Sequence, residues 1–284
     1  MRVIYGFSSI IKNSTGFPRR NFPAVTKTSL SVAIITLDAA TQIGACLASV
    51  AFADDIVIVD SGSRDDTVAI AESCGARVVH APWRGFGPQK QLAVQNAKYD
   101  WVLCVDADER VTPELAMSII GAIDAQAATG APLCPAFRMA RCNRFLGRWL
   151  RYGEGYPDWS VRLFDRRVAR WSDDAVHERV IHGGAAAPLS GDLMHESAES
   201  LEQYLDKQNT YTTLQAQRLH AEGCSAALPR LVASPLLRFF KFYFLRLGFL
   251  DGWPGLVHIS IGCMNSFMKY AKVLELRFAA GARK

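Results

Sequence analysis

The chain has 284 residues, of which 50% are hydrophobic and 21% are charged. This hydrophobic share excludes an intrinsically disordered chain, which lacks the apolar side chains needed to offset the entropy of ordering. The net charge of +5 suits a membrane surface, a nucleic acid or an anionic substrate and does not choose among them. The cysteines form no C-x-x-C pair, which is typical of buried, reduced thiols in a cytosolic protein.

The first 28 residues form a separate basic segment. They contain five basic residues and no acidic ones, and polar residues interrupt their apolar stretches. The segment therefore lacks the pattern of a signal peptide. We interpret residues 1–28 as a flexible leader outside the fold.

Residues 30–133 alternate between short apolar runs and helical patterns. Strands are predicted at 30–37, 55–59, 76–80 and 101–105. Helices are predicted at 41–50, 65–73, 88–97 and 113–128. The apolar runs are rich in β-branched residues, as in strands buried on both faces. The alternation predicts an α/β fold, in which helices cover both faces of a mostly parallel, Rossmann-like sheet.

Polar clusters follow several of these strands. Thr36 and Asp38 follow the first, the segment 60–63 follows the second, and the segment 106–109 follows the fourth. Ligands of open α/β sheets bind at the carboxyl ends of the strands, so the sequence predicts a site at this edge. Asp106 and Asp108 supply the oxygen ligands that Mg²⁺ or Mn²⁺ shares with substrate phosphates. The alternative for this pair is a solvated acidic turn.

The other clusters predict contacts with a nucleotide. Asp60, Ser61 and Gly62 can bind a base or ribose edge, although Ser63 could instead cap the following helix. Lys90 brings a positive charge to a glycine-containing helix start, where a phosphate can bind; an exposed lysine in a simple loop is the alternative. No G-x-G-x-x-G follows the first strand, which disfavours a dinucleotide fold of the usual kind.

The motifs DSGSRDDT, GFGPQK and WVLCVDADERVTPEL resemble those of family-two glycosyltransferases of the GT-A fold. These enzymes transfer a sugar from a nucleotide donor with inversion at the anomeric carbon. The later motifs GRWLRYG, YPDWSVRLFDRR, LMHES and FLRLGFLDGWPGL are similar to the bacterial branch that adds glucose to the inner core of lipopolysaccharide. The resemblance covers about residues 30–277. It implies a metal-dependent hexosyltransferase with UDP-glucose as donor and a lipid-linked core oligosaccharide as acceptor.

The resemblance also implies roles for individual residues. Thr36 and Asp60 would contact the nucleoside, Lys90 the base or diphosphate, Asp106 the ribose, Asp108 the metal, and His195 the metal and diphosphate. Relatives usually have Asn-Glu after the first-strand threonine, whereas this chain has Asp38 and Ala39. Asp38 can replace the asparagine, but the glutamate is lost, which puts donor affinity at that edge in doubt.

Displacement at an anomeric carbon needs a base that takes the proton of the acceptor hydroxyl. Glu154, Asp158 and Glu178 follow the nucleotide-binding half and are the candidates. The resemblance favours Asp158, which lies four residues before Arg162, with Glu178 as second choice. A simple ion pair between Asp158 and Arg162 is the alternative. Arg162, Arg166, Arg167 and Arg179 are predicted to form a basic neighbourhood for a phosphorylated acceptor.

After the leader, the chain is predicted to have three parts. Residues 29–133 are predicted to bind the nucleotide sugar, and 134–222, with antiparallel strands and a helix over 200–221, to form the acceptor side of the same catalytic domain. Residues 223–284 form a basic, aromatic tail, in which Arg238, Lys241 and Arg246 interrupt the apolar run. This pattern predicts amphipathic helices on an anionic membrane surface, peripheral to the cytoplasmic face of the bacterial inner membrane. An ordinary buried helix pair is the alternative.

Other functions fit the sequence less well. A nucleotidyltransferase that makes a sugar nucleotide would carry a glycine-rich, basic loop after the first strand, and none is present. A non-catalytic, transferase-like membrane scaffold is compatible with the departure at Asp38 and Ala39, but the intact Asp106 and Asp108 argue against it. A nucleic-acid partner is not predicted, because no recognition module occurs.

Overall fold

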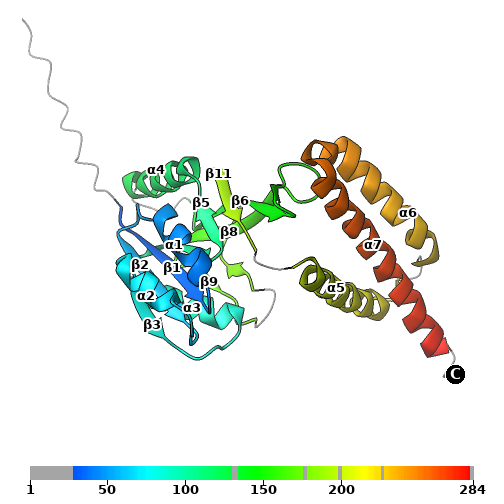
Figure 1. Cartoon of the computed structure of the whole chain (residues 1–284), viewed down its shortest axis with the longest axis horizontal. Coiled ribbons are helices and arrows are strands. Elements are labelled where there is room, and N and C mark those ends of the chain that lie inside the picture. The colour runs from blue at the N-terminus through cyan, green and yellow to red at the C-terminus, as the bar shows by residue number, and fades with distance from the viewer. Residues whose placement is uncertain (1–27, 130–133, 175–177, 198–199, 225–226, 282–284) are drawn as a thin grey trace, which may run out of the picture.

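The computed structural model describes residues 28–129, 134–174, 178–197, 200–224 and 227–281. Residues 1–27 of the predicted leader lie outside these ranges. The described chain has an α/β part, on the left of Figure 1, and a group of C-terminal helices on the right. The long strand β6 extends from the α/β part toward these helices.

The α/β part is built on one large sheet. Its strands are β1 (Leu30–Thr36), β2 (Asp55–Asp60), β3 (Arg77–His80), β4 (Trp101–Asp106), β5 (Glu109–Val111), β6 (Ala136–Phe145), β7 (Arg148–Trp149), β8 (Asp158–Asp165) and β11 (Ala187–His195). The order is β3-β2-β1-β4-β8-β6-β11-β5, and β7 pairs with β6. A separate small sheet pairs β9 (Arg170–Trp171) with β10 (Val180–Ile181).

The first half of the sheet confirms the predicted α/β pattern. Strands β1, β2, β3 and β4 are parallel neighbours. The helices between and after them are α1 (Ala40–Ser49), α2 (Thr67–Ser73), α3 (Phe86–Gln95) and α4 (Pro113–Thr129). Helix α3 begins two residues before the predicted start, so Pro88 is not its first residue, whereas Pro113 does begin α4 as predicted.

Helices cover both faces of this sheet because alternate side chains of a strand point to opposite faces. On β1, Val32 and Ile34 pack in one core with residues of α1, α2 and α4. Ala33 and Ile35 pack in a second core with residues of α3. Every residue of β1 is buried, as expected for the central strand of a doubly covered sheet.

The second half of the sheet adds antiparallel pairs, as predicted. β8 is antiparallel to both β4 and β6. The sequence analysis did not predict β5 or β11. β11 lies between β6, to which it is parallel, and β5, to which it is antiparallel. Because β5 directly follows the turn after β4, this pairing places the end of β11 beside that turn.

The C-terminal helices form a compact group. They are α5 (Leu201–Ala221), α6 (Ala227–Phe239), the π-helical segment η1 (Phe240–Leu245), the 3-10 segment η2 (Gly248–Asp251) and α7 (Gly252–Gly281). We call residues 227–281 the C-terminal hairpin. Helix α7 packs against both α6 and α5. Among the residues described, no helix combines the length and the apolar character that crossing a bilayer requires.

The loop after β7 joins the hairpin to the α/β part. The buried Asp251 carboxylate accepts hydrogen bonds from the backbone N–H groups of Arg151 and Tyr152, at 3.1 and 2.9 Å. Glu154 of the same loop forms an ion pair with Arg238 of α6. These polar contacts hold the hairpin beside the loop after β7.

Candidate active site

The carboxyl ends of the parallel strands meet at one edge, as predicted. In the sheet register, Thr36 is paired with Asp60 across β1 and β2, and Ile35 is paired with Asp106 across β1 and β4. The hydroxyl of Thr36 is buried and has no hydrogen-bond partner within the described parts of the chain. A buried polar atom without a partner costs free energy, so this hydroxyl is suited to receive a ligand group.

Asp60 organises the turn after β2. Its carboxylate accepts hydrogen bonds from the backbone N–H of Gly62 at 2.9 Å and of Ser63 at 3.0 Å, and from the Ser63 hydroxyl. Gly62 has a φ of 103°, which favours glycine, and this lets the chain fold back over Asp60. Burial alone would raise the pKa of Asp60, but these hydrogen bonds outweigh it and lower the pKa. Ser63 does not cap α2, whose N-cap residue is Asp66.

Two further side chains shape this edge. Gln89 of α3 donates a hydrogen bond from Nε2 to the Ser61 hydroxyl at 3.1 Å. The exposed Asp38 has a φ of 48°, its Oδ1 accepts from the backbone N–H of Arg64 at 2.7 Å, and its own N–H donates to Ser63 at 2.9 Å. Asp38 therefore ties the loop after β1 to the loop after β2.

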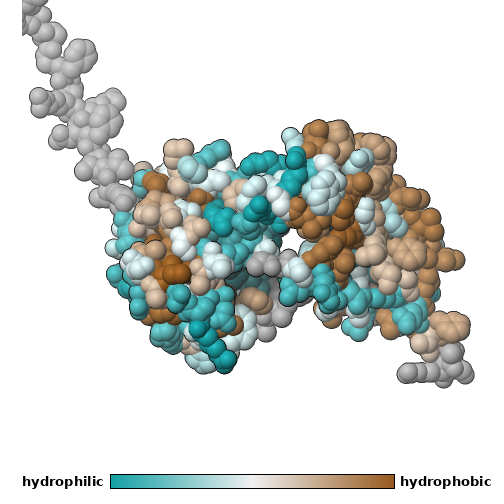
Figure 2. All heavy atoms as spheres, viewed as in Figure 1, coloured by the Kyte–Doolittle hydropathy of each residue, from teal (hydrophilic) through white to brown (hydrophobic). Residues whose placement is uncertain are grey.

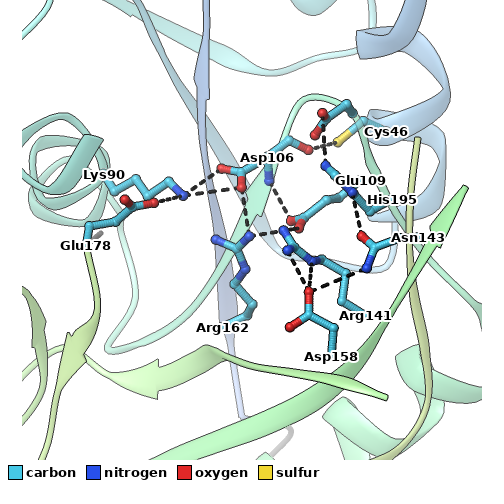
Figure 3. Close-up of polar contacts among 11 residues, drawn as sticks. Cys46, Lys90, Asp106, Glu109, Arg141, Asn143, Asp158, Arg162, Glu178 and His195 are labelled. Atoms are coloured by element: carbon cyan, nitrogen blue, oxygen red, sulfur yellow. Dashed lines mark hydrogen bonds and ion pairs between the residues drawn. The ribbon is translucent and has the colours of Figure 1, made fainter. Parts of the chain in front are cut away.

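Asp106 lies at the centre of a charged network (Figure 3). Its carboxylate is 3.0 Å from Lys90 Nζ and 2.7 Å from Arg162 Nη2. Arg162 also contacts Glu109 at 2.7 Å, and Lys90 contacts Glu178 at 2.8 Å. Burial alone would raise the pKa of Asp106, but Arg162 and Lys90 outweigh it and hold the pKa far below its usual range. Asp106 is therefore ionised and fixed in place.

A second chain of contacts starts at Asp108. His195, at the end of β11, has Nε2 3.3 Å from Asp108 Oδ2 and Nδ1 2.8 Å from Asn143 Oδ1. Asn143 Nδ2 is in turn 3.5 Å from Asp158 Oδ2. The antiparallel pairing of β11 with β5 brings His195 next to the turn that carries Asp108.

Asp108 and His195 are the side chains that could hold a metal ion. Within the described ranges, no group of three His, Cys, Asp or Glu side chains could hold one. Mg²⁺ is usually bound by one or two carboxylates and completed by water and substrate phosphates, and Mn²⁺ also takes oxygen ligands. The pair therefore fits a metal site that a substrate diphosphate completes, and Asp106 is already held by two cationic side chains.

The candidate bases are separated in space. Asp158 receives hydrogen bonds from Arg141 Nε and Nη2, at 2.9 and 2.6 Å, and does not pair with Arg162. Figure 3 shows Glu178 and Lys90 on the opposite side of Asp106 from Asp158. Glu154 is tied to the C-terminal hairpin by its ion pair with Arg238.

The predicted basic neighbourhood does not form. Arg162 is buried against Asp106 and Glu109. Arg166 and Arg167 contact Asp100, directly before β4, and therefore lie at the opposite end of that strand from Asp106. The prediction was wrong because Arg162 lies within β8, whereas Arg166 and Arg167 lie in the turn after it, and a count of arginines does not reveal this separation.

Sequence reasoning missed Glu109, Arg141 and Asn143. Glu109 is fully buried, its Oε2 accepts the backbone N–H of Asp106 at 2.9 Å, and its Oε1 contacts Arg162. Its place in the DADE motif was a signal. Arg141 and Asn143 are two residues apart on β6 and therefore share a face, but only the tertiary structure relates that face to Asp158.

A cavity of about 820 Å³ opens beside this group. Asp108, His195, Arg141 and Asn143 contribute to one wall, and residues of α5 contribute to the other. The size is within the range of small-molecule sites in proteins. Asp158 is joined to this wall through Arg141 and Asn143.

Comparisons with known proteins show the family of this chain. The sequence profile described as Glycosyl transferase family 2 matches residues 31–177. An uncharacterized glycosyltransferase from Rickettsia bellii is 32% identical over 259 residues, which cover 87% of this chain and 86% of the relative. The lipopolysaccharide core biosynthesis glycosyltransferase LpsC from Rhizobium meliloti is 29% identical over 269 residues, covering 91% and 96% of the chains.

Among solved structures, TarS 1-349 from S. aureus is similar with a TM-score of 0.41 and 14% identity, covering 89% of this chain and 92% of that one. The family profile spans more than half of the chain, and the Rickettsia bellii relative aligns along most of both proteins. The chain therefore belongs to glycosyl transferase family 2.

Proposed function

We propose that the protein transfers glucose from UDP-glucose to a sugar of the lipopolysaccharide core. The observation that carries this proposal is the position of Asp106 and Asp108, at the carboxyl end of β4 and beside a cavity large enough for a sugar acceptor. The similarity to LpsC, which is named for lipopolysaccharide core biosynthesis, supports the acceptor class. Residues 29–133 would bind the donor and residues 134–222 the acceptor.

The donor nucleotide would bind at the edge formed by β1, β2 and β4. Thr36 offers its buried hydroxyl, and Asp60, Ser61 and Gly62 form the turn beside it. Asp38 borders the same loop. Asp106 would accept hydrogen bonds from the ribose. Lys90, held between Asp106 and Glu178, places a positive charge where the diphosphate would lie.

Asp108 and His195 would hold Mg²⁺ or Mn²⁺ together with the donor diphosphate. When bound, such an ion neutralises the charge that develops on the leaving diphosphate. Asn143 Oδ1 accepts a hydrogen bond from Nδ1 of His195, and this contact fixes the ring so that Nε2 faces Asp108.

Asp158 is the proposed base for the acceptor hydroxyl. Arg141 and Asn143 hold its carboxylate, and both residues line the cavity beside Asp108. A proton-accepting carboxylate must come within hydrogen-bond reach of the hydroxyl that attacks. Glu178 is less suited, because it lies beyond Lys90 and its carboxylate is occupied by the ammonium group at 2.8 Å.

The C-terminal hairpin would attach the enzyme to the cytoplasmic face of the inner membrane as a peripheral protein. Figure 2 shows apolar surface concentrated over α6 and α7. The most exposed apolar side chains there include Leu228, Val232, Leu236, Leu237, Leu245 and Trp253. Arg230, Lys241 and Arg246 are exposed on the same hairpin. Apolar side chains combined with basic groups are the features of helices that lie in an anionic membrane interface.

Donor and acceptor screening tests this function. The whole chain is incubated with Mn²⁺, a heptose-containing core oligosaccharide and a panel of sugar nucleotides, and the products are followed by mass spectrometry. We expect the acceptor to gain one hexose from UDP-glucose and UDP to be released. In a parallel incubation with UTP and glucose 1-phosphate, formation of UDP-glucose with release of pyrophosphate would indicate a nucleotidyltransferase. The absence of any transfer product with every donor would contradict the proposal.

A further inference from the structure

We propose that helix α5 binds the acceptor. The acceptor is an oligosaccharide of at least two sugar rings, which lies along α5 from Asp108 outward. This inference rests on the proposed transferase function. It assigns a binding role to Tyr204, Lys207 and Tyr211, which lie outside the catalytic group already described.

The cavity has two unlike walls. The catalytic wall contains Asp108, His195 and Asn143 and so includes the proposed metal ligands. The opposite wall consists largely of one face of α5. Its α5 residues are Leu201, Tyr204, Lys207, Gln208 and Tyr211, with the N-cap residue Ser200 before them. Their spacing of three or four residues makes them one stripe of the helix. The same cavity therefore borders both Asp108 and α5, and a ligand long enough to span it contacts both.

The length of this wall exceeds what one sugar needs. From Ser200 to Tyr211 the helix rises about 16 Å, at 1.5 Å per residue. A single sugar ring is much shorter than this distance. Only the ring nearest Asp108 can react, so the remaining length of α5 is available to further rings of the acceptor.

The chemistry of the wall suits carbohydrate. Phe145 lies 5.5 Å from Tyr204 and 5.2 Å from His258 between ring centroids, so aromatic rings gather in one part of the cavity. The C–H face of a sugar ring stacks on such rings. Lys207 and Gln208 carry groups that hydrogen-bond to hydroxyls. A few polar groups placed among aromatic side chains are typical of specific ligand sites.

Contacts at its first turn and with α7 hold helix α5 in place beside the cavity. Ser200 and Gln203 form a reciprocal capping box at its first turn. Asn265 of α7 donates a hydrogen bond to Gln208 at 2.8 Å, and Lys272 of α7 binds Asn209 and Thr212 of α5. Because α7 belongs to the C-terminal hairpin, the acceptor wall is fixed to the same element that we propose to lie on the membrane.

The test uses the full chain and the variants Lys207→Gln and Tyr211→Ala, with Arg218→Gln as matched control. Arg218 is exposed on α5, outside the cavity, and pairs with Glu222. The probes are a delipidated, heptose-containing core oligosaccharide and heptose itself. Transfer kinetics gives KM and kcat for each acceptor, and calorimetry gives the affinity for UDP with Mn²⁺ and for the oligosaccharide without donor.

We expect each cavity variant to raise the oligosaccharide KM about tenfold, which corresponds to one good contact. The heptose KM, kcat and the UDP affinity should stay within twofold of wild type, as should every value of the Arg218→Gln variant. Unchanged oligosaccharide KM, or equal increases for both acceptors, overturns the inference. A wild-type protein that transfers no sugar contradicts the proposed function. Even then, a wild type that binds the oligosaccharide and two variants that do not would support α5 as the acceptor-binding wall. A wild type that binds no oligosaccharide overturns the inference.

Discussion

His195 and Asp108 are in contact, although the two segments that carry them are distant in the sequence. Nε2 of His195 is 3.3 Å from Oδ2 of Asp108, and the backbone N–H of Glu196 donates to the carbonyl oxygen of Asp108 at 3.0 Å. The end of β11 is thus fixed to the turn that carries the D-x-D motif.

Loss of either member of this pair should impair metal-dependent transfer. Asp108→Asn and His195→Ala are each expected to lower turnover about 10²–10³-fold, because a group that stabilises developing charge is lost. Their UDP affinity in the presence of Mn²⁺ should fall, and their unfolding midpoints should stay close to wild type. Asp173→Asn is the control, since that side chain is 82% exposed and forms a surface ion pair with Arg170. Full activity of Asp108→Asn in EDTA would contradict the metal assignment.

The two base candidates can be separated by conservative substitution. Asp158→Asn should retain UDP binding, and its turnover should fall about 10²–10⁴-fold, which is the usual contribution of a general base to the rate. Glu178→Gln should act differently, because its loss disturbs Lys90 and so weakens donor binding. Steady-state kinetics with calorimetry distinguishes the effects. Wild-type turnover in Asp158→Asn combined with a dead Glu178→Gln would move the base to Glu178.

Arg162 should matter for stability as well as for the site. Its removal in Arg162→Met leaves Asp106 and the fully buried Glu109 without their shared cation. Breaking such a buried ion pair costs about 3–5 kcal/mol in the free energy of unfolding. Arg218→Met is the matched control, because Arg218 and its partner Glu222 are 80% and 53% exposed and surface pairs contribute little to stability. Urea unfolding at pH 7 measures the free energy of unfolding of both variants. Equal losses in the two variants would show that the buried network does not stabilise the fold more than a surface ion pair does.

Asp55 predicts a pH-dependent contribution to stability far from the site. Burial alone would raise its pKa, but hydrogen bonds from Arg77, the Lys98 backbone and Ser31 outweigh it and lower the pKa. The stability gained is fully present above about pH 5 and is lost as the pH falls through the lowered pKa. Asp55→Asn should therefore lose about 1–3 kcal/mol at pH 7. The gap to wild type should narrow below about pH 4; a gap independent of pH would contradict this account.

The C-terminal hairpin should bind anionic membranes through its exposed apolar residues. The combined variant Leu236→Ser, Leu237→Ser and Trp253→Ser removes side chains that are 66%, 69% and 65% exposed. It should float with phosphatidylglycerol vesicles several-fold less than wild type. Met117→Ser with Val168→Ser is the control, because these residues are 68% and 54% exposed on the α/β part. Equal flotation of both variants and wild type would count against an interfacial hairpin.

The central sheet and the sheet edge that carries the candidate site were predictable from the order of apolar runs and polar clusters along the chain. The strands predicted at 30–37, 55–59 and 101–105 match β1, β2 and β4 to within one residue, because burial on both faces demands short, continuous apolar runs, which is a local property. Asp60 and Asp106 follow such runs directly, so their meeting at one edge follows from parallel pairing. The bounds of α3 were less certain from sequence, because Gly85, rather than Pro88, marks its start.

The tertiary structure alone decided which charged groups meet. Asp158 and Arg162 lie four residues apart, yet Asp158 binds Arg141 of β6, and Arg162 binds Asp106 and Glu109. Strand β11 delivers His195 to Asp108 only because it pairs with β5. Such partners depend on strand order and register over long sequence separations, and single-sequence patterns carry information chiefly about neighbours along the chain.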